Sequence, residues 1–79
     1  MLQLDPVSGV PLLTVREQQV LELVAQGLSA KEVAQEIDIA PRTVERHIEN
    51  VRLKTRARNR THMVTLTLEA GILISSRDV

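Results

Sequence analysis

The chain has 79 residues, ten basic and ten acidic side chains, and no Cys, Phe, Tyr or Trp. This length suits one small domain, and the missing cysteines exclude disulfides and zinc fingers, so we expect no metal and no cofactor. The lack of aromatic residues argues against modules that stack single-stranded bases on aromatic rings.

The two ends of the chain lack helical patterning. Residues 1–12 contain two prolines and a glycine, which predict a flexible arm or an interdomain linker. We place the folded domain at residues 13–74 and a frayed tail at residues 75–79. Neither a signal peptide nor an apolar run of ~18 residues is visible, so the expected location is the cytoplasm rather than a membrane.

A capping box begins the first predicted helix. In this motif a Ser or Thr hydroxyl and the carboxylate three residues later each accept a hydrogen bond from the other residue's backbone N–H group, as Thr14 and Glu17 can do here. Gly27 is placed to end the helix in a left-handed conformation. We therefore expect a helix over residues 15–26 with an apolar stripe of Val20, Leu21 and Val24, which Leu28 continues just after the stop at Gly27.

The next two helices form the centre of the prediction. A second capping box, Ser29 with Glu32, begins a short helix over residues 30–37. Pro41 suits the first turn of another helix over residues 41–55, because a first-turn N–H needs no helical partner. Two helices joined by such a short turn can cross steeply and offer the second helix to the DNA major groove. An ordinary αα-hairpin of a helical bundle is the alternative.

The fourth predicted helix has more apolar surface than a lone small domain needs. Asn59 is the expected N-cap, and the helix runs over residues 60–70. Val64 and Leu68 share one face. The second, surplus face is either a homodimer interface or a surface covered by the apolar residues that follow the helix. Its members are Met63, Leu66, Thr67 and Ala70.

The charge is distributed unevenly along the chain. Residues 40–60 hold seven basic and two acidic side chains, a net +5, so the remainder of the neutral chain carries −5. Such a cluster suits a phosphate backbone, although a solvated helix face could look similar. Glu45 and Glu49 lie three residues after Arg42 and Arg46, so we expect two i,i+3 ion pairs that hold these arginines in position.

Two segments, taken in order, resemble the DNA-binding domain of the LuxR/FixJ/NarL (GerE-type) bacterial transcription regulators. They are "LTVREQQVLELVAQGLSAKEVAQEIDIAPRTVERHIENVRLK" and "RNRTHMV". The resemblance implies an all-α, four-helix (tetrahelical) helix-turn-helix fold whose third helix enters the major groove of double-stranded DNA. It also implies homodimerisation through the fourth helix on an inverted-repeat site. An upstream sensor or receiver domain outside this chain is implied as well, although a stand-alone regulator fits equally. RNA polymerase is a further candidate partner.

Candidate contacts follow from the chemistry of each side chain. Arg46 is the first choice for a base edge, because a guanidinium can donate two parallel hydrogen bonds to guanine, and Glu49 could accept one from cytosine. We expect Arg52 and Arg56 only to add to the positive field, and His47 to bond a backbone carbonyl. The base candidates are Arg42, Glu45, Arg46, Glu49 and Asn50. The phosphate candidates are Ser29, Lys31, Thr43, Lys54, Arg58 and Arg60.

Three positions depart from the family pattern and leave the length of the third helix open. Ala40 cannot cap that helix with a side chain, Thr55 replaces an apolar residue near its end, and Leu53 is apolar on its outer face.

Neither a Gly-rich phosphate loop nor a paired nucleophile and base is present, so we do not expect an enzyme. Two other functions fit: a sigma-factor region-4-like promoter-binding domain, or a helical protein-interaction module that does not bind DNA.

Overall fold

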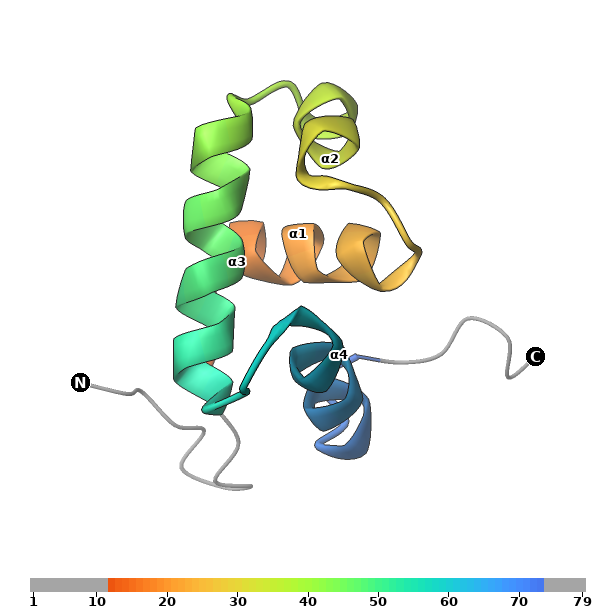
Figure 1. Cartoon of the computed structure of the whole chain (residues 1–79), viewed down its shortest axis with the longest axis vertical. Coiled ribbons are helices and arrows are strands. Elements are labelled where there is room, and N and C mark those ends of the chain that lie inside the picture. Colours follow the sequence, from red (N-terminus) through yellow and green to blue (C-terminus); the bar gives the residue numbers. More distant parts are fainter. Residues whose placement is uncertain (1–11, 74–79) are drawn as a thin grey trace.

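The computed structural model describes residues 12–73, which form four helices and no strand (Figure 1). The all-α prediction is confirmed, and each helix begins and ends within one residue of its predicted limits. The predicted tail over residues 75–79 lies outside the described residues, as does the predicted arm over residues 1–12 apart from Leu12. Of the described helices, none is long and apolar enough to cross a membrane. The helices are α1 (Val15–Ala25), α2 (Ala30–Ile37), α3 (Pro41–Thr55) and α4 (Arg60–Glu69).

Both predicted capping boxes are formed. The Thr14 N–H donates to Glu17 Oε1 over 2.9 Å, and the Glu17 N–H donates to Thr14 Oγ1 over 3.0 Å. Ser29 and Glu32 make the same two bonds at the start of α2. Ala40 makes no side-chain cap at the start of α3, as its sequence predicts. Local polar residues therefore decide where the first two helices begin.

A left-handed residue follows each of the four helices, including Gly71 with φ 76° after α4. Gly27 has φ 96° after α1, Asp38 has φ 57° after α2, and Arg56 has φ 58° after α3. Asp tolerates this conformation better than most side chains, and it lets the Ile39 N–H donate to the Ala34 carbonyl over 3.1 Å. The turn between α2 and α3 is thereby closed in a few residues, which brings the two helices into the helix-turn-helix arrangement.

The longest helix, α3, contacts each of the other three helices. Figure 1 shows α3 upright along one edge of the domain, with α2 beside one end, α4 toward the other, and α1 crossing between them. Ala34, which is buried, has only a methyl group and so allows α2 to approach α3 closely. The opposite side of α3 is left uncovered. The buried apolar residues are Val20, Leu21, Val24, Val33, Ala34, Val44, Ile48, Val51, Ala57, Met63 and Leu73.

The packing of α4 differs from the prediction. Met63 and Thr67 are fully buried inside the domain, whereas Leu68 is 44% exposed. The assignment of Met63 and Thr67 to a dimer surface is therefore wrong, whereas Leu66 of the same predicted face is half-buried and Ala70 is exposed. A flexible Met side chain can fill a core that has no aromatic residue. Burial of the Thr67 hydroxyl is compensated by its hydrogen bond to the Met63 carbonyl at 2.8 Å, and the following Leu73 also packs into the core.

Candidate nucleic-acid interface

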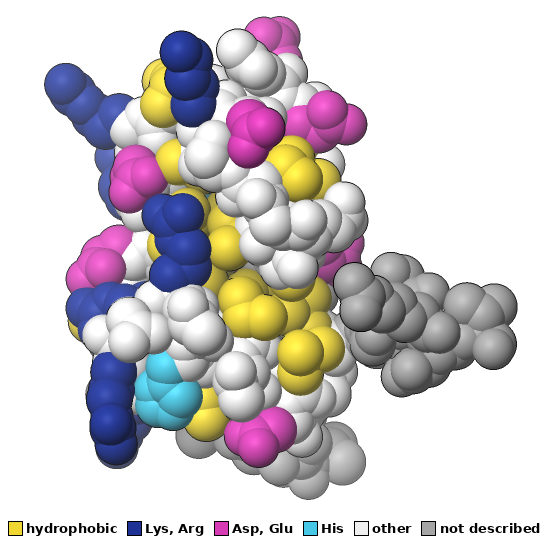
Figure 2. Space-filling view, turned by 45° about the vertical axis from the view of Figure 1, so that its right-hand side comes forward, with side chains coloured by type: hydrophobic (Ala, Val, Ile, Leu, Met, Phe, Trp, Pro, Cys, Tyr) yellow, Lys and Arg dark blue, Asp and Glu magenta, His cyan; other side chains and the backbone are white. Residues whose placement is uncertain are grey.

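The outer side of α3 is the candidate DNA-binding surface. Its core-facing residues Val44, Ile48 and Val51 are buried, which turns the positions opposite them into solvent. Figure 2 shows Lys and Arg side chains gathered along one side of the domain, with acidic side chains between them. All of the base candidates are exposed on this helix, namely Arg42, Glu45, Arg46, Glu49 and Asn50. Leu53 joins them as an apolar member of the same surface and is 55% exposed.

The two glutamates of this surface pair with different arginines from those predicted. Glu49 pairs with Arg52 at 2.6 Å, and Glu45 faces Arg60, the first residue of α4, at 3.6 Å. Within residues 12–73, the ion pairs include neither Arg42 nor Arg46. The predicted pairs of Arg42 with Glu45 and Arg46 with Glu49 are therefore wrong. As a consequence, the side chains of Arg42 and Arg46 extend from α3 without an acidic partner there.

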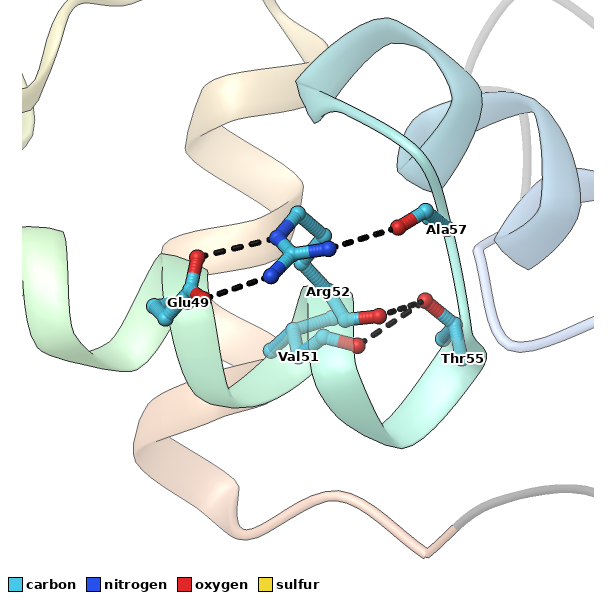
Figure 3. A network of polar contacts seen from close by, with 5 residues as sticks. All are labelled: Glu49, Val51, Arg52, Thr55 and Ala57. Carbon is cyan, nitrogen blue, oxygen red and sulfur yellow. Dashed lines mark hydrogen bonds and ion pairs between the residues drawn. The ribbon is translucent and has the colours of Figure 1, made fainter.

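Arg52 is held at three points (Figure 3). Its Nε donates to Glu49 Oε1 over 2.9 Å, its Nη2 to Glu49 Oε2 over 2.6 Å, and its Nη1 to the Ala57 carbonyl over 2.9 Å. The hydrogen bonds from Arg52 are the main reason that the pKa of Glu49 is lowered, and the same bonds raise the pKa of Arg52. Arg52 was expected only to add to the positive field. The carbonyl contact explains why Glu49 pairs with it, since the folded turn fixes Arg52 but not Arg46.

Lys54 is half-buried at the flank of α3, beside the start of α1. Its Nζ donates to Glu17 Oε1 over 2.6 Å and to the Leu12 carbonyl over 3.3 Å. Glu17 is only 4% exposed and also completes the cap with Thr14. The ammonium group of Lys54 is thus committed to a tertiary contact between α3 and the start of α1, and its prediction as a phosphate contact is wrong. The sequence held the signal, because Glu17 lies on the apolar stripe of α1 and a buried carboxylate needs a partner.

This pair predicts a specific dependence of stability on pH. Burial alone would raise the pKa of Glu17, but hydrogen bonds from Lys54 and Thr14, together with the Lys54 charge, leave it below the ordinary value of 4.5. Since the pKa of Glu17 is lower in the folded state than in the unfolded state, ionised Glu17 stabilises the fold fully above its unfolded pKa. This stabilisation is lost as pH falls through the pKa that Glu17 has in the folded state. Wild type should therefore be more stable than Glu17→Gln at pH 7, and this advantage should shrink below about pH 4.5.

Urea unfolding of both proteins from pH 7 to pH 3 measures this difference. The other carboxylates are present in both proteins, so subtraction isolates Glu17. Lys54→Met, which keeps the apolar stem and removes the charge, should reduce stability at pH 7 and make the Glu17 carboxyl easier to protonate. A stability difference between wild type and Glu17→Gln that stays constant over this pH range would contradict the assignment.

The remaining candidates lie at the starts of α2 and α3 and in the segment that leads from α3 into α4. Ser29 and Lys31 are exposed at the start of α2, and the Ser29 hydroxyl accepts the capping bond of that helix. Thr43 is half-buried in the first turn of α3. Arg58 and Arg60 are exposed where the chain passes from α3 into α4. All of these positions except the half-buried Thr43 are exposed, and their contacts with phosphate stay predictions.

The two histidines lie in different surroundings. His62 accepts a hydrogen bond at Nδ1 from the Arg58 backbone N–H over 3.0 Å and so stabilises the turn before α4. His47 Nδ1 is buried, and residues 12–73 offer it no hydrogen-bond partner. The expected bond between His47 and a backbone carbonyl is therefore not made by that atom.

Known proteins are similar to this chain in sequence. Residues 11–67 match the family model described as "Bacterial regulatory proteins, luxR family". The chain is 46% identical over 67 residues to the transcriptional regulatory protein FixJ of Rhizobium meliloti (strain 1021), which covers 85% of this chain and 33% of FixJ. It is 41% identical over 63 residues to the spore germination protein GerE of Bacillus subtilis (strain 168), covering 80% of this chain and 85% of GerE. The chain thus spans about a third of the length of FixJ but most of GerE.

A solved structure shows the same fold. The structure described as "VqmA bound to DPO" superposes with a TM-score of 0.73 at 30% sequence identity. The match covers 85% of this chain and 35% of that chain. The similarity therefore extends over nearly all of the described helices and concerns one part of the larger protein.

Proposed function

The chain belongs to the luxR family of bacterial regulatory proteins, and from this premise we propose that it binds double-stranded DNA sequence-specifically and regulates transcription. In this proposal α3 lies in the major groove and α2 crosses the backbone beside it. One observation carries the proposal: a helix-turn-helix leaves the side of α3 that holds Arg42 and Arg46 uncovered, and within residues 12–73 neither arginine has an acidic partner.

Arg46 is the proposed centre of base recognition. It lies midway along the outer side of α3, and its guanidinium can donate two parallel hydrogen bonds to O6 and N7 of guanine. Arg42 lies one turn closer to the start of α3 and can reach a base or a phosphate. Asn50 can pair with adenine, and Glu49 or Glu45 can accept a hydrogen bond from cytosine N4.

Phosphate contacts are proposed at the margins of this surface. Ser29 and Lys31 lie at the start of α2, and Thr43 lies near the start of α3, where the helix dipole favours an anion. Arg58 and Arg60 are proposed to contact the backbone where the chain leaves the groove. The pair between Arg60 and Glu45 is long and exposed, so a phosphate can replace the carboxylate at little cost.

Homodimerisation through α4 is proposed on a revised surface. With Met63 and Thr67 inside the core, the half-buried Leu66 and the exposed Ala70 are what remains of the original face. Leu68, the most exposed large apolar side chain of the helix, lies on the opposite face with Val64 and offers the alternative contact surface. A two-fold dimer places two copies of α3 on half-sites related by the same symmetry, which produces an inverted repeat in the DNA. RNA polymerase and an upstream sensor or receiver domain are proposed as partners of the whole regulator.

Selection of bound duplexes from a random DNA pool tests the proposal. We expect an enriched motif made of two inverted half-sites. A single asymmetric motif would preserve DNA recognition and contradict the homodimer. Failure to enrich any motif from duplex DNA would contradict sequence-specific binding itself.

A further inference from the structure

We propose that Arg52 is a positioning residue: it orients the Glu49 carboxylate toward the DNA bases and ties that orientation to the turn between α3 and α4. This inference rests on the proposed function, because it concerns how one side chain of the α3 surface is presented to DNA. It assigns a role in specificity to a residue that need not touch a base.

The geometry fixes the plane of the carboxylate. Both oxygens of Glu49 accept from the same guanidinium, at 2.9 and 2.6 Å, in the parallel arrangement that Arg and carboxylate groups prefer (Figure 3). A single ion pair would let the carboxylate rotate, whereas two parallel bonds hold both groups in one plane. The Glu49 side chain is therefore preorganised before DNA arrives.

The guanidinium is itself anchored by the turn. Its Nη1 donates to the carbonyl of Ala57 over 2.9 Å, and the Ala57 N–H donates back to the Arg52 carbonyl over 3.0 Å. Ala57 is buried, so this anchor belongs to the packed part of the domain. Thr55 Oγ1 also donates to the Arg52 carbonyl over 3.1 Å. The orientation of Glu49 thus depends on the turn that links α3 to α4, and not on α3 alone.

The exposure of the two groups indicates which one faces the DNA. The Glu49 side chain is 53% exposed and the Arg52 side chain 29%, so the carboxylate is the outer group and the guanidinium lies behind it. An ionised carboxylate can accept about four hydrogen bonds, of which Arg52 supplies two. Glu49 can therefore still accept from cytosine N4, and the charge of Arg52 offsets its repulsion from the phosphates.

Arg52→Lys is the decisive substitution, because Lys keeps the charge but cannot form the planar fork. Affinities are measured for wild type and variant on the selected site and on duplexes changed at each base pair. We expect Arg52→Lys to lose several-fold preference at one base pair per half-site, with preferences elsewhere and the salt dependence unchanged. Glu49→Gln should lose preference at the same base pair, and the double variant should lose no more than either single one.

Controls separate this role from stability and from phosphate binding. Arg56→Lys changes an exposed arginine next to the same turn and should leave every base preference intact. If Arg52→Lys does not fold, Arg52→Gln provides the test, because its single amide cannot form the fork while the base-reading carboxylate of Glu49 is left unchanged; the loss of preference should again be confined to one base pair per half-site. Thermal unfolding of each variant shows which of them are folded.

The outcomes are distinct. If Arg52→Lys keeps all base preferences, or loses affinity equally for every duplex, the positioning role of Arg52 is overturned. DNA binding by α3 would be unaffected by either result. If wild type itself enriches no motif, the proposed function fails, and the inference fails with it.

Discussion

Arg46→Ala is expected to weaken binding to the cognate duplex by ~1–3 kcal/mol, a factor of roughly 5 to 150, and to relax the preference at one base pair of each half-site. The reason is the position of Arg46, which is exposed midway along the outer side of α3. Within residues 12–73, no ion pair neutralises it. Its guanidinium therefore needs no rearrangement of a salt bridge before it meets a guanine. Affinities for a panel of single-base variants of the selected site measure both effects.

Arg58→Ala is the matched control for this result. It removes the same charge at the margin of the surface, where a phosphate contact is proposed, so it should weaken binding to all sequences about equally and reduce the salt slope by about 1. If Arg46→Ala behaves in the same way as Arg58→Ala, Arg46 contacts the backbone and the assignment of the base-reading centre is wrong.

Met63→Ala is expected to lower the free energy of unfolding by ~2–5 kcal/mol. Met63 is fully buried and is among the largest buried side chains of the domain, so truncation leaves a cavity that the surrounding helices can only partly fill. A loss of this size is a large fraction of the stability of a domain this small. Met63→Leu nearly conserves the volume and should cost less than ~1.5 kcal/mol.

Urea unfolding at two protein concentrations distinguishes the core from a dimer interface. Because Met63 lies within one subunit, the loss should be the same at both concentrations. Leu68→Ala, at the exposed side of α4, should change stability little and should instead weaken association and binding to the full inverted repeat. If Met63→Ala lowers the free energy of unfolding only at the concentration where the protein is a dimer, and leaves the monomer as stable as wild type, Met63 belongs to the dimer interface as first predicted.

The helices could be predicted closely because their ends are set by local chemistry. Thr14, Ser29 and Asn59 cap the helices within a few residues of themselves, and Gly27 and Asp38 end them through their own backbone conformations. The residues on the outer surface of α3 could be predicted equally well. The apolar residues of that helix form one buried stripe, and helical periodicity then determines which residues lie on the opposite side. These features need no knowledge of how distant segments pack.

The errors concern contacts that form only when distant segments meet. Periodicity divides α4 into two apolar faces but does not say which of them meets α3, and Met63 rather than Leu68 turned inward. Lys54 appeared in the basic cluster, although the buried Glu17 draws it toward the start of α1. The choice of Arg52 over Arg46 as the partner of Glu49 depends on a carbonyl that reaches Arg52 only after the turn has folded.

The α3 surface is expected to bind duplex DNA through its positive charge. The affinity of the domain for its selected duplex, measured over a range of salt concentrations, tests this. We predict a straight line of log affinity against log salt, falling by about 0.9 for each phosphate neutralised, and a shallower line for Arg58→Ala. A flat response, or no binding to duplex DNA at low salt, would contradict DNA binding by the α3 surface and favour a helical protein-interaction module.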